Sequence, residues 1–190
     1  CVLHWHRNDG PVRAGDVVLV DAAVEGHDFY TADITRTYPA SGTFTAAQQS
    51  VFDVVQAAHD AAIASIQPGD AFHDSQDVAW GVLVDGLIDL GVFRPSQRSE
   101  ALDPATMLHR RYTLHRTSHH LGLDVHDCQA IAAEYRSGSL EPGMVFTIEP
   151  GLYLQENDDT VPEHLRGIGV RIEDDVLCTA DGCDVLTSAG

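Results

Sequence analysis

The sequence is short of basic residues, of cysteine and of long apolar runs. Lys and Arg together number 11 of 190 residues, against 29 Asp and Glu, so the formal net charge is −18. Nucleic acids and anionic membrane surfaces both bind basic protein faces, so this balance excludes both as partners. No apolar run reaches the roughly 18 residues that a membrane-spanning helix needs. The sequence therefore predicts a soluble protein, part of whose negative charge is available to cations.

Cysteine is scarce, and its spacing forms no recognisable pair. The four cysteines (Cys1, Cys128, Cys178 and Cys183) include no C-x-x-C, which excludes a dense disulfide framework. Cys178 and Cys183 flank a "TADG" turn and could face each other across a hairpin. A disulfide or a zinc site there is the alternative, but we expect reduced thiols and a cytoplasmic location. Because the sequence begins at Cys1 and not at Met, we expect further chain upstream.

Strand-like segments occur at both ends of the sequence. Residues 16–25 and 29–39 are apolar, β-branched or aromatic and predict a hairpin. Residues 143–154 predict a strand that is broken by Pro-Gly. Residues 167–187 predict two strands around an Asp-Gly turn. These segments together predict a largely antiparallel sheet.

Two helical patterns lie between the strands. Thr45 opens a capping-box pattern with Gln48, and the helix that follows is expected to end at "QPGD". A second helix is expected from about residue 74 to 90, with Gly91 as its stop. The segment 92–112 has weak periodicity and predicts a loop with a short helix.

The length and composition allow one sizeable core. At 190 residues and 44% hydrophobic, the chain is expected to form one domain over residues 1–190. The order of elements predicts an α+β fold, in which the helices cover one face of the sheet.

Four acidic residues stand among apolar strand residues. They are Asp21 after "VVLV", Asp33 in "TADIT", Glu149 in "VFTIEP" and Glu173 in "GVRIEDD". A buried carboxylate costs several kcal/mol unless a cation compensates it. Arg36 and Arg171 are near enough in sequence to pair with some of them, but two arginines leave a surplus of negative charge. Metal ions would remove that surplus.

The segment "SHHLGLDVHD" (118–127) adds three histidines to this acidic set. Four carboxylates with one imidazole form an oxygen-rich ligand set, which suits Mn²⁺, Co²⁺, Fe²⁺ or Zn²⁺ better than copper. Two divalent ions would balance four carboxylates, and such ions share bridging carboxylates at roughly 3.5–4 Å separation. The spacing alone leaves open whether the segment is a metal site or an ordinary polar loop.

Four segments together resemble the successive signatures of the pita-bread metallopeptidases. They are "VDAAVEGHDFYTADITRTYP", "HRTSHHLGLDVHD", "TIEPGLY" and "GIGVRIEDD", and with the histidine of "LHWH" they span residues 4–175 in the family's order. Within the family the sequence is most similar to aminopeptidase P, and next to prolidase. The resemblance implies the pita-bread fold, with helices on the outer face of a curved antiparallel sheet. It also implies hydrolysis of the bond between an N-terminal residue and a following proline.

By this resemblance, two divalent metal ions are held by Asp21, Asp33, His119, Glu149 and Glu173. Asp33 and Glu173 would bridge both ions, Asp21 would bind one, and His119 and Glu149 the other. We favour Mn²⁺ over Co²⁺, Zn²⁺ or Fe²⁺. Glu149 would also carry a proton between the attacking water and the leaving nitrogen. The substrates would be peptides with proline at the second position, and the full-length protein would be a homo-oligomer, either a dimer or a tetramer.

The resemblance assigns roles to four further residues. His126 would stabilise the developing oxyanion. His115 and His4 would line the substrate site. Arg171 would orient Glu173 without touching a metal ion.

Two residues depart from the family's pattern. Ala23 stands where the family usually has glycine, and Arg116 where a small residue follows the first histidine of the motif. Arg116 could narrow the substrate site or anchor a carboxylate. We expect His120 to be a wall residue and Tyr153 to serve packing. The remaining histidines have no motif around them and are expected at the surface: His6, His27, His59, His73, His109 and His164.

The family's leading elements and its separate N-terminal domain have no counterpart in this sequence. We therefore expect the 190 residues to be the C-terminal catalytic part of a longer protein. The apolar faces of the two helices and of the sheet would then be exposed unless another segment covers them. Two other functions remain open: an Xaa-Pro dipeptidase (prolidase), and a pita-bread module that binds a partner without catalysis.

Overall fold

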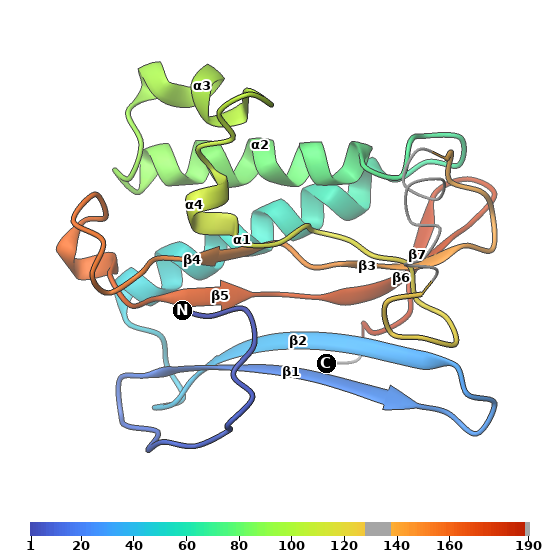
Figure 1. Ribbon diagram of the computed structural model, residues 1–190, viewed down its shortest axis with the longest axis horizontal. Helices are drawn as coiled ribbons and strands as arrows, with labels where there is room; N and C mark the ends of the chain where they lie inside the picture. The colour runs from blue at the N-terminus through green and yellow to red at the C-terminus, as the bar shows by residue number, and fades with distance from the viewer. Residues whose placement is uncertain (128–137, 189–190) are drawn as a thin grey trace.

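Helices and strands are arranged in layers around a pair of long, broken strands. The computed structural model describes residues 1–127 and 138–188. Figure 1 shows the helices α1 (Ala46–Ser65) and α2 (Asp74–Asp89) above the central strands and the first hairpin below them. Every strand pair in these residues is antiparallel. The predicted α+β class and antiparallel sheet are therefore confirmed.

The first hairpin carries the first two acidic positions on one face. Strand β1 (Val17–Glu25) pairs with β2 (Thr31–Pro39), and the register places Asp21 opposite Thr35 and Ala23 opposite Asp33. Because side chains alternate along a strand, these four residues share the same face of the hairpin. The predicted hairpin is confirmed.

Both predicted helices begin and end close to where the sequence placed them. The Thr45 side chain accepts from the Gln48 backbone N–H at 3.2 Å, and the Gln48 side chain accepts from the Thr45 N–H at 2.9 Å, so the capping box is present. After α2, Gly91 adopts a left-handed φ of 74°, which is the conformation that glycine tolerates best. Within the described ranges, no helix has the length and apolarity needed to cross a membrane.

The C-terminal strands break at two neighbouring places. Strand β3 (Val145–Ile148) pairs with β6 (Asp174–Cys178), whereas β4 (Gly151–Tyr153) pairs with β5 (Gly169–Arg171) in another sheet. The breaks lie side by side, because the Ile172 N–H donates to the Pro150 carbonyl at 3.4 Å. The predicted break at Pro-Gly is confirmed. The prediction of two strands over 167–187 is wrong, because a further break at residues 172–173 makes three, the last being β7 (Cys183–Val185).

The segment 92–112 is more helical than its weak periodicity indicated. It contains a 3₁₀ turn η1 (Pro95–Gln97) and helix α3 (Arg98–Leu102), and helix α4 (Arg110–Thr113) begins within it. Another 3₁₀ turn, η3 (Glu163–Leu165), precedes β5. In Figure 1, α3 lies on the side of α2 that faces away from the strands.

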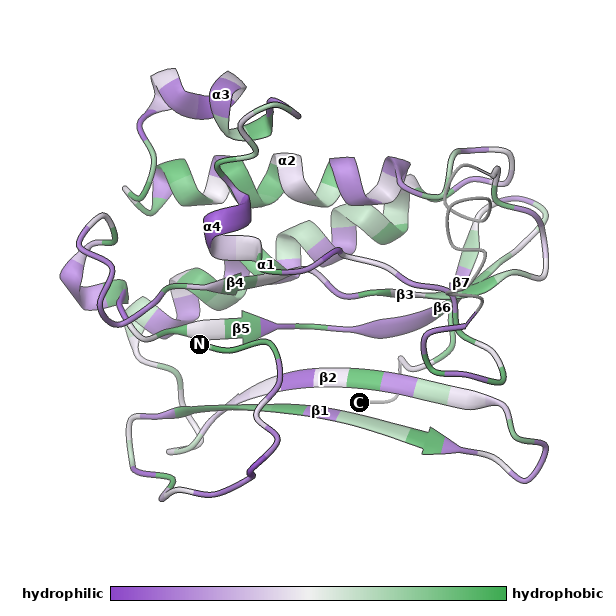
Figure 2. Cartoon of the chain, in the orientation of Figure 1, coloured by the Kyte–Doolittle hydropathy of each residue, from purple (hydrophilic) through white to green (hydrophobic). Residues whose placement is uncertain are grey.

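The expectation of exposed helix faces is wrong, whereas the hairpin does expose apolar side chains. Val55 of α1 and Leu83 and Leu87 of α2 are fully buried, since the two helices pack on each other and on the central strands. On β1, by contrast, Val20 is 46% exposed and Val24 68% exposed. Figure 2 shows these hydrophobic stretches along the outermost strand.

The cysteine prediction is confirmed for the residues that the structure describes. Cys178 and Cys183 are opposite each other in the β6–β7 hairpin, as the "TADG" turn predicted, and both are free thiols. Burial raises the pKa of each thiol, which disfavours the reactive thiolate form. Cys128 lies outside the described residues.

The contact between α1 and α2 depends on a missing side chain at Gly86. A Cβ at this position would lie 2.2 Å from Cγ1 of Val54, whereas a Cβ at Gly81, on the same helix, would meet nothing within 4 Å. We expect Gly86→Ala to lower the free energy of unfolding by about 1–3 kcal/mol through overpacking. Gly81→Ala should raise it by up to about 1 kcal/mol, because alanine has the better helix propensity. Urea denaturation of both variants tests this, and equal effects at the two positions would contradict the packing.

Candidate metal centre

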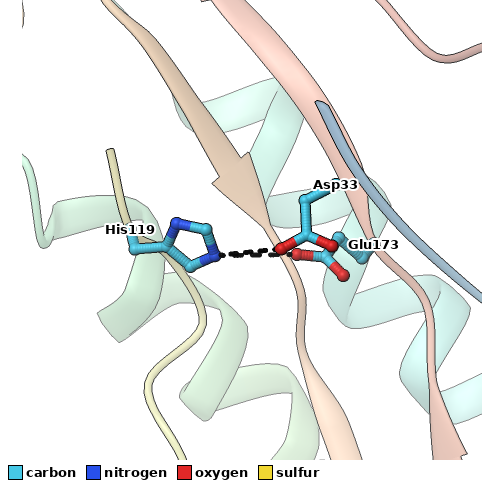
Figure 3. Close-up of side chains that lie close together, drawn as sticks. All are labelled: Asp33, His119 and Glu173. Carbon is cyan, nitrogen blue, oxygen red and sulfur yellow. Dashed lines mark ion pairs between the residues drawn. The ribbon is translucent and has the colours of Figure 1, made fainter. Parts of the chain in front are cut away.

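Three side chains from distant parts of the sequence converge in the interior. Asp33 lies on β2, His119 precedes β3, and Glu173 lies in the break between β5 and β6; one donor atom of each lies within 4.8 Å of the others. His119 Nε2 is 3.6 Å from Asp33 Oδ2 and 3.9 Å from Glu173 Oε1. Figure 3 shows the imidazole nitrogen directed at both carboxylates. These residues are three of the five predicted ligands.

Glu149 joins this group from the other strand break. Its Oε1 lies 3.4 Å from His119 Nε2 and accepts from the Thr147 hydroxyl at 3.4 Å. The loop that carries His119 is held beside β3, since the Thr147 N–H donates to the His119 carbonyl and the Glu149 N–H to the Thr117 carbonyl. His119 Nδ1 donates to the His120 carbonyl at 3.1 Å. That bond directs Nε2, the other ring nitrogen, toward the carboxylates, where it can bind a metal ion.

Asp21 is linked to the other predicted ligands by hydrogen bonds of a buried arginine. Arg171, only 1% exposed, donates from Nη2 to Asp21 Oδ2 at 2.6 Å and from Nε to the Thr35 hydroxyl at 3.1 Å. Thr35 in turn donates to Glu173 Oε2 at 2.6 Å. Arg171 therefore orients Glu173 only through Thr35, while its direct ion pair is with Asp21.

Tyr153 is part of the same hydrogen-bond chain, although the sequence indicated only packing. Its hydroxyl accepts from Arg171 Nη1 at 2.6 Å and lies 2.7 Å from His115 Nε2. His115 Nδ1 donates to the Arg116 carbonyl at 2.6 Å, so Nε2 is the acceptor and the Tyr153 hydroxyl the donor. Burial lowers the pKa of His115 to about 4 and raises the pKa of Tyr153 to about 12. Both groups are therefore neutral at physiological pH.

A cleft of about 670 Å³ opens onto these residues. Asp21, Ala23 and Asp33 of the hairpin line it, as do His4 and His126 from the two loops that face the hairpin. The rings of His126 and His119 are 4.4 Å apart at 75°. The predicted site residues therefore surround one cleft and its buried floor, and none lies on a remote surface. Arg116 is exposed.

The buried acids repel one another in the absence of a cation. Burial raises the pKa of Glu149 and of Glu173, and the neighbouring Glu149 and Asp33 charges raise that of Glu173 further. Although burial opposes it, the surrounding carboxylates raise the pKa of His119. The group thus takes up protons where no metal ion is bound.

The donor set fits a divalent cation. Glu173 Oε1 is buried and accepts no hydrogen bond within the described part of the chain. A buried oxygen without a partner costs roughly 1–3 kcal/mol, and more when it is charged. Carboxylate oxygens with one imidazole nitrogen are ligands that Mn²⁺, Fe²⁺, Co²⁺ and Zn²⁺ all accept. A cation at this place would replace the protons and bind the oxygen that accepts no hydrogen bond.

Several residues of the site were missed by the sequence analysis. Thr35 and Asp175 each lie two residues after a predicted ligand, which is the spacing that places side chains on the same face of a strand. Asp175 Oδ2 accepts the Asp33 backbone N–H at 3.2 Å. The spacing of two residues from a predicted ligand could have identified Thr35 and Asp175. Thr147, two residues before Glu149, could have been identified in the same way.

Two histidines that were expected at the surface are buried, so that prediction is wrong for them. His59 is 4% exposed and packs behind the central strands, and His109 is 1% exposed and lies against Trp80. His59 is on the buried side of α1, and His109 directly precedes α4. His120 stacks on Phe72 with ring centroids 4.3 Å apart, in the apolar interior behind the site.

Buried carboxylates that converge on an imidazole at the floor of a cleft are a donor set that metal-dependent hydrolases use. Residues 1–180 match metallopeptidase family M24, and the chain belongs to that family. Membership in a family of metallopeptidases implies divalent metal ions.

Proteins similar to this chain include bacterial Xaa-Pro aminopeptidases and an aminopeptidase P of known structure. Xaa-Pro aminopeptidase 1 of Streptomyces coelicolor is 54% identical over 184 residues, which are 96% of this chain and 37% of the relative. Xaa-Pro aminopeptidase of Escherichia coli is 41% identical over 189 residues, 100% of this chain and 42% of the relative. The structure of proline aminopeptidase P II from Yersinia pestis superposes with a TM-score of 0.91 at 41% identity, over 100% of this chain and 42% of that one. The chain spans about two fifths of the length of these relatives, and the predicted pita-bread fold is confirmed.

Glu173→Gln should stabilise the metal-free protein. The folded-state pKa of Glu173 is raised above its ordinary 4.5, so the folded state keeps a proton that the unfolded state loses, and stability falls as the pH rises above about 4.5. Glutamine does not titrate, so the variant does not lose this stability as the pH rises. We expect the chelated variant to be more stable than the wild type at pH 8, on the order of 1–3 kcal/mol, with a smaller difference at pH 5.

Denaturant unfolding at both pH values measures this, with exposed Glu163→Gln as the control that changes little. Added Mn²⁺ should stabilise the wild type and not Glu173→Gln. A variant that is less stable than the wild type at pH 8 without metal would show that the carboxylate is attracted, not repelled, by its surroundings.

Proposed function

We propose that the full-length protein is a metal-dependent aminopeptidase that removes an N-terminal residue from before proline. The observation that carries the proposal is the buried convergence of Asp33, His119 and Glu173, with Glu149 beside them. The relatives named Xaa-Pro aminopeptidase, at 41–54% identity, supply the reaction. A pita-bread binding module without catalysis would have no need of this donor set.

Two divalent ions would be held by Asp21, Asp33, His119, Glu149 and Glu173. Asp33 and Glu173 approach His119 Nε2 from separate segments of the chain, at 3.6 Å and 3.9 Å, so both could contribute to holding the ions. When bound, the ions would polarise the scissile carbonyl and lower the pKa of a water molecule. We take Mn²⁺ as the physiological ion, with Co²⁺, Zn²⁺ and Fe²⁺ as the alternatives that the same donors accept.

The remaining groups of the chain move protons and orient the peptide. Glu149, beside His119 in the group of donors, would carry a proton from the attacking water to the leaving nitrogen. His126, in the cleft wall beside His119, stabilises the charge that develops on the carbonyl oxygen. His115, neutral and fixed by Tyr153, and His4 hold the substrate in the cleft.

The chemistry of proline explains why a dedicated enzyme is useful. The bond before proline is a tertiary amide without an N–H donor, which most peptidases do not accommodate.

We further propose that the full-length protein is a homo-oligomer, a dimer or a tetramer. The free Cys178 and Cys183 fit a reducing compartment such as the cytoplasm.

The full-length protein should hydrolyse Xaa-Pro-Xaa tripeptides only with its metal ions. Chelation should abolish turnover, and Mn²⁺ should restore it. Asp33→Asn should lower kcat/KM by at least about 10²-fold, because it weakens the metal site and the charge stabilisation in the transition state. Asp159→Asn, at an exposed position outside the cleft, is the control. Equal activity after exhaustive chelation would contradict the proposal.

A comparison of substrates separates the two peptidase functions. An aminopeptidase should cleave an Xaa-Pro-Xaa tripeptide at least as well as an Xaa-Pro dipeptide. Exclusive cleavage of the dipeptide would identify a prolidase instead, and metal binding without cleavage of either would identify a binding module.

A further inference from the structure

Glu173 is held in place by contacts other than a regular strand ladder. It occupies the break between β5 and β6, where only its bridge to Thr35 continues the sheet. Its N–H donates to the Thr35 carbonyl at 3.0 Å, and its side chain accepts from the Thr35 hydroxyl. Its own carbonyl accepts from Arg36 Nη1 at 2.6 Å. One guanidinium therefore fixes the peptide that follows this carboxylate.

The same guanidinium is anchored on the next residue. Arg36 Nη2 donates to Asp174 Oδ1 at 2.8 Å, and the Thr187 hydroxyl donates to the same oxygen at 2.6 Å. The other oxygen, Asp174 Oδ2, lies 3.1 Å from His59 Nε2, on helix α1. The side chains of Arg36, Asp174 and His59 are 20%, 9% and 5% exposed, so little solvent screens these contacts.

The alternation of side chains places this group behind the metal centre. Glu173 and Asp175 face β2, where Asp175 accepts the Asp33 N–H, whereas Asp174 between them faces α1. The Thr187 hydroxyl also accepts the Asp175 N–H at 3.0 Å. The contacts of Arg36 and Thr187 therefore reach the backbone directly after Glu173, at its carbonyl and at the Asp175 N–H.

We propose that Arg36, His59 and Asp174 form a clamp that positions Glu173 for metal binding. The clamp residues do not touch the proposed ions, so they are positioning residues, and the inference rests on the proposed metal centre. Polar contacts behind metal ligands typically contribute 10–100-fold to metal affinity. The planar fork of arginine is essential here, because it spans a carbonyl and a carboxylate together, which the single ammonium of lysine does not.

Calorimetric titration of Mn²⁺ alone into the chelated full-length protein tests the clamp. We expect Arg36→Lys to weaken Mn²⁺ binding by at least about tenfold. The control is Arg111→Lys, which disrupts a two-bond pair with Asp158 away from the cleft and should leave Mn²⁺ affinity within threefold of the wild type. Thermal unfolding without metal should shift comparably for the two variants, so that a general loss of stability is distinguished from a loss of positioning.

A second pair of variants tests the clamp if Arg36→Lys does not fold. His59→Leu removes the contact to Asp174 but keeps a buried apolar side chain on α1, and should also weaken Mn²⁺ binding about tenfold. His59→Gln retains a donor and should restore affinity to within threefold. Wild-type affinity in Arg36→Lys and His59→Leu would overturn the clamp while leaving the metal centre intact. A wild-type protein that binds no Mn²⁺ would overturn the proposed function itself.

Discussion

Electrostatic repulsion among buried carboxylates is the constraint on which the rest of the structure depends. Oxygens of Asp33, Glu149 and Glu173 lie within 3.9 Å of a single imidazole nitrogen. One imidazolium cannot neutralise three acids, and burial multiplies the cost of each unpaired charge. The metal-free protein meets that cost by raising pKa values, whereas divalent ions would remove it. The part of the fold in which buried acids repel one another is thus the part best suited to bind cations.

The fold departs from regular structure at the places where these acids are needed. Glu149 and Glu173 lie in adjacent strand breaks, where the ladder changes from the β3–β6 sheet to the β4–β5 sheet. Backbone groups released by the breaks are satisfied across the gap and by Arg36. Local rules of strand formation are often broken at functional sites and compensated nearby. Arg171, Thr35 and Tyr153 provide such compensation on the side of the cleft.

Much of the fold followed from periodicity, and most of the site from acids in apolar surroundings. The helices and the first hairpin have clear periods, but the break before Asp174 lies within a continuous apolar and acidic run that gives no turn signal. The four acids stood out by their apolar neighbours, whereas their roles as ligands and the choice of His119 came from resemblance to a family. His59 was misplaced because it was judged alone; it lies four residues after Val55 and three before Ala62, on the buried stripe of α1. Hydrogen bonds between distant residues, such as Tyr153 with His115, leave no local pattern.

Anomalous diffraction from crystals of the Mn²⁺-loaded full-length protein would test the metal centre most directly. Two manganese peaks are predicted, within roughly 4 Å of each other, with Asp33 and Glu173 between them and His119 Nε2 bound to one. The centre would be contradicted by crystals grown in excess Mn²⁺ that show no peak at these side chains and keep the carboxylates protonated or paired with arginine.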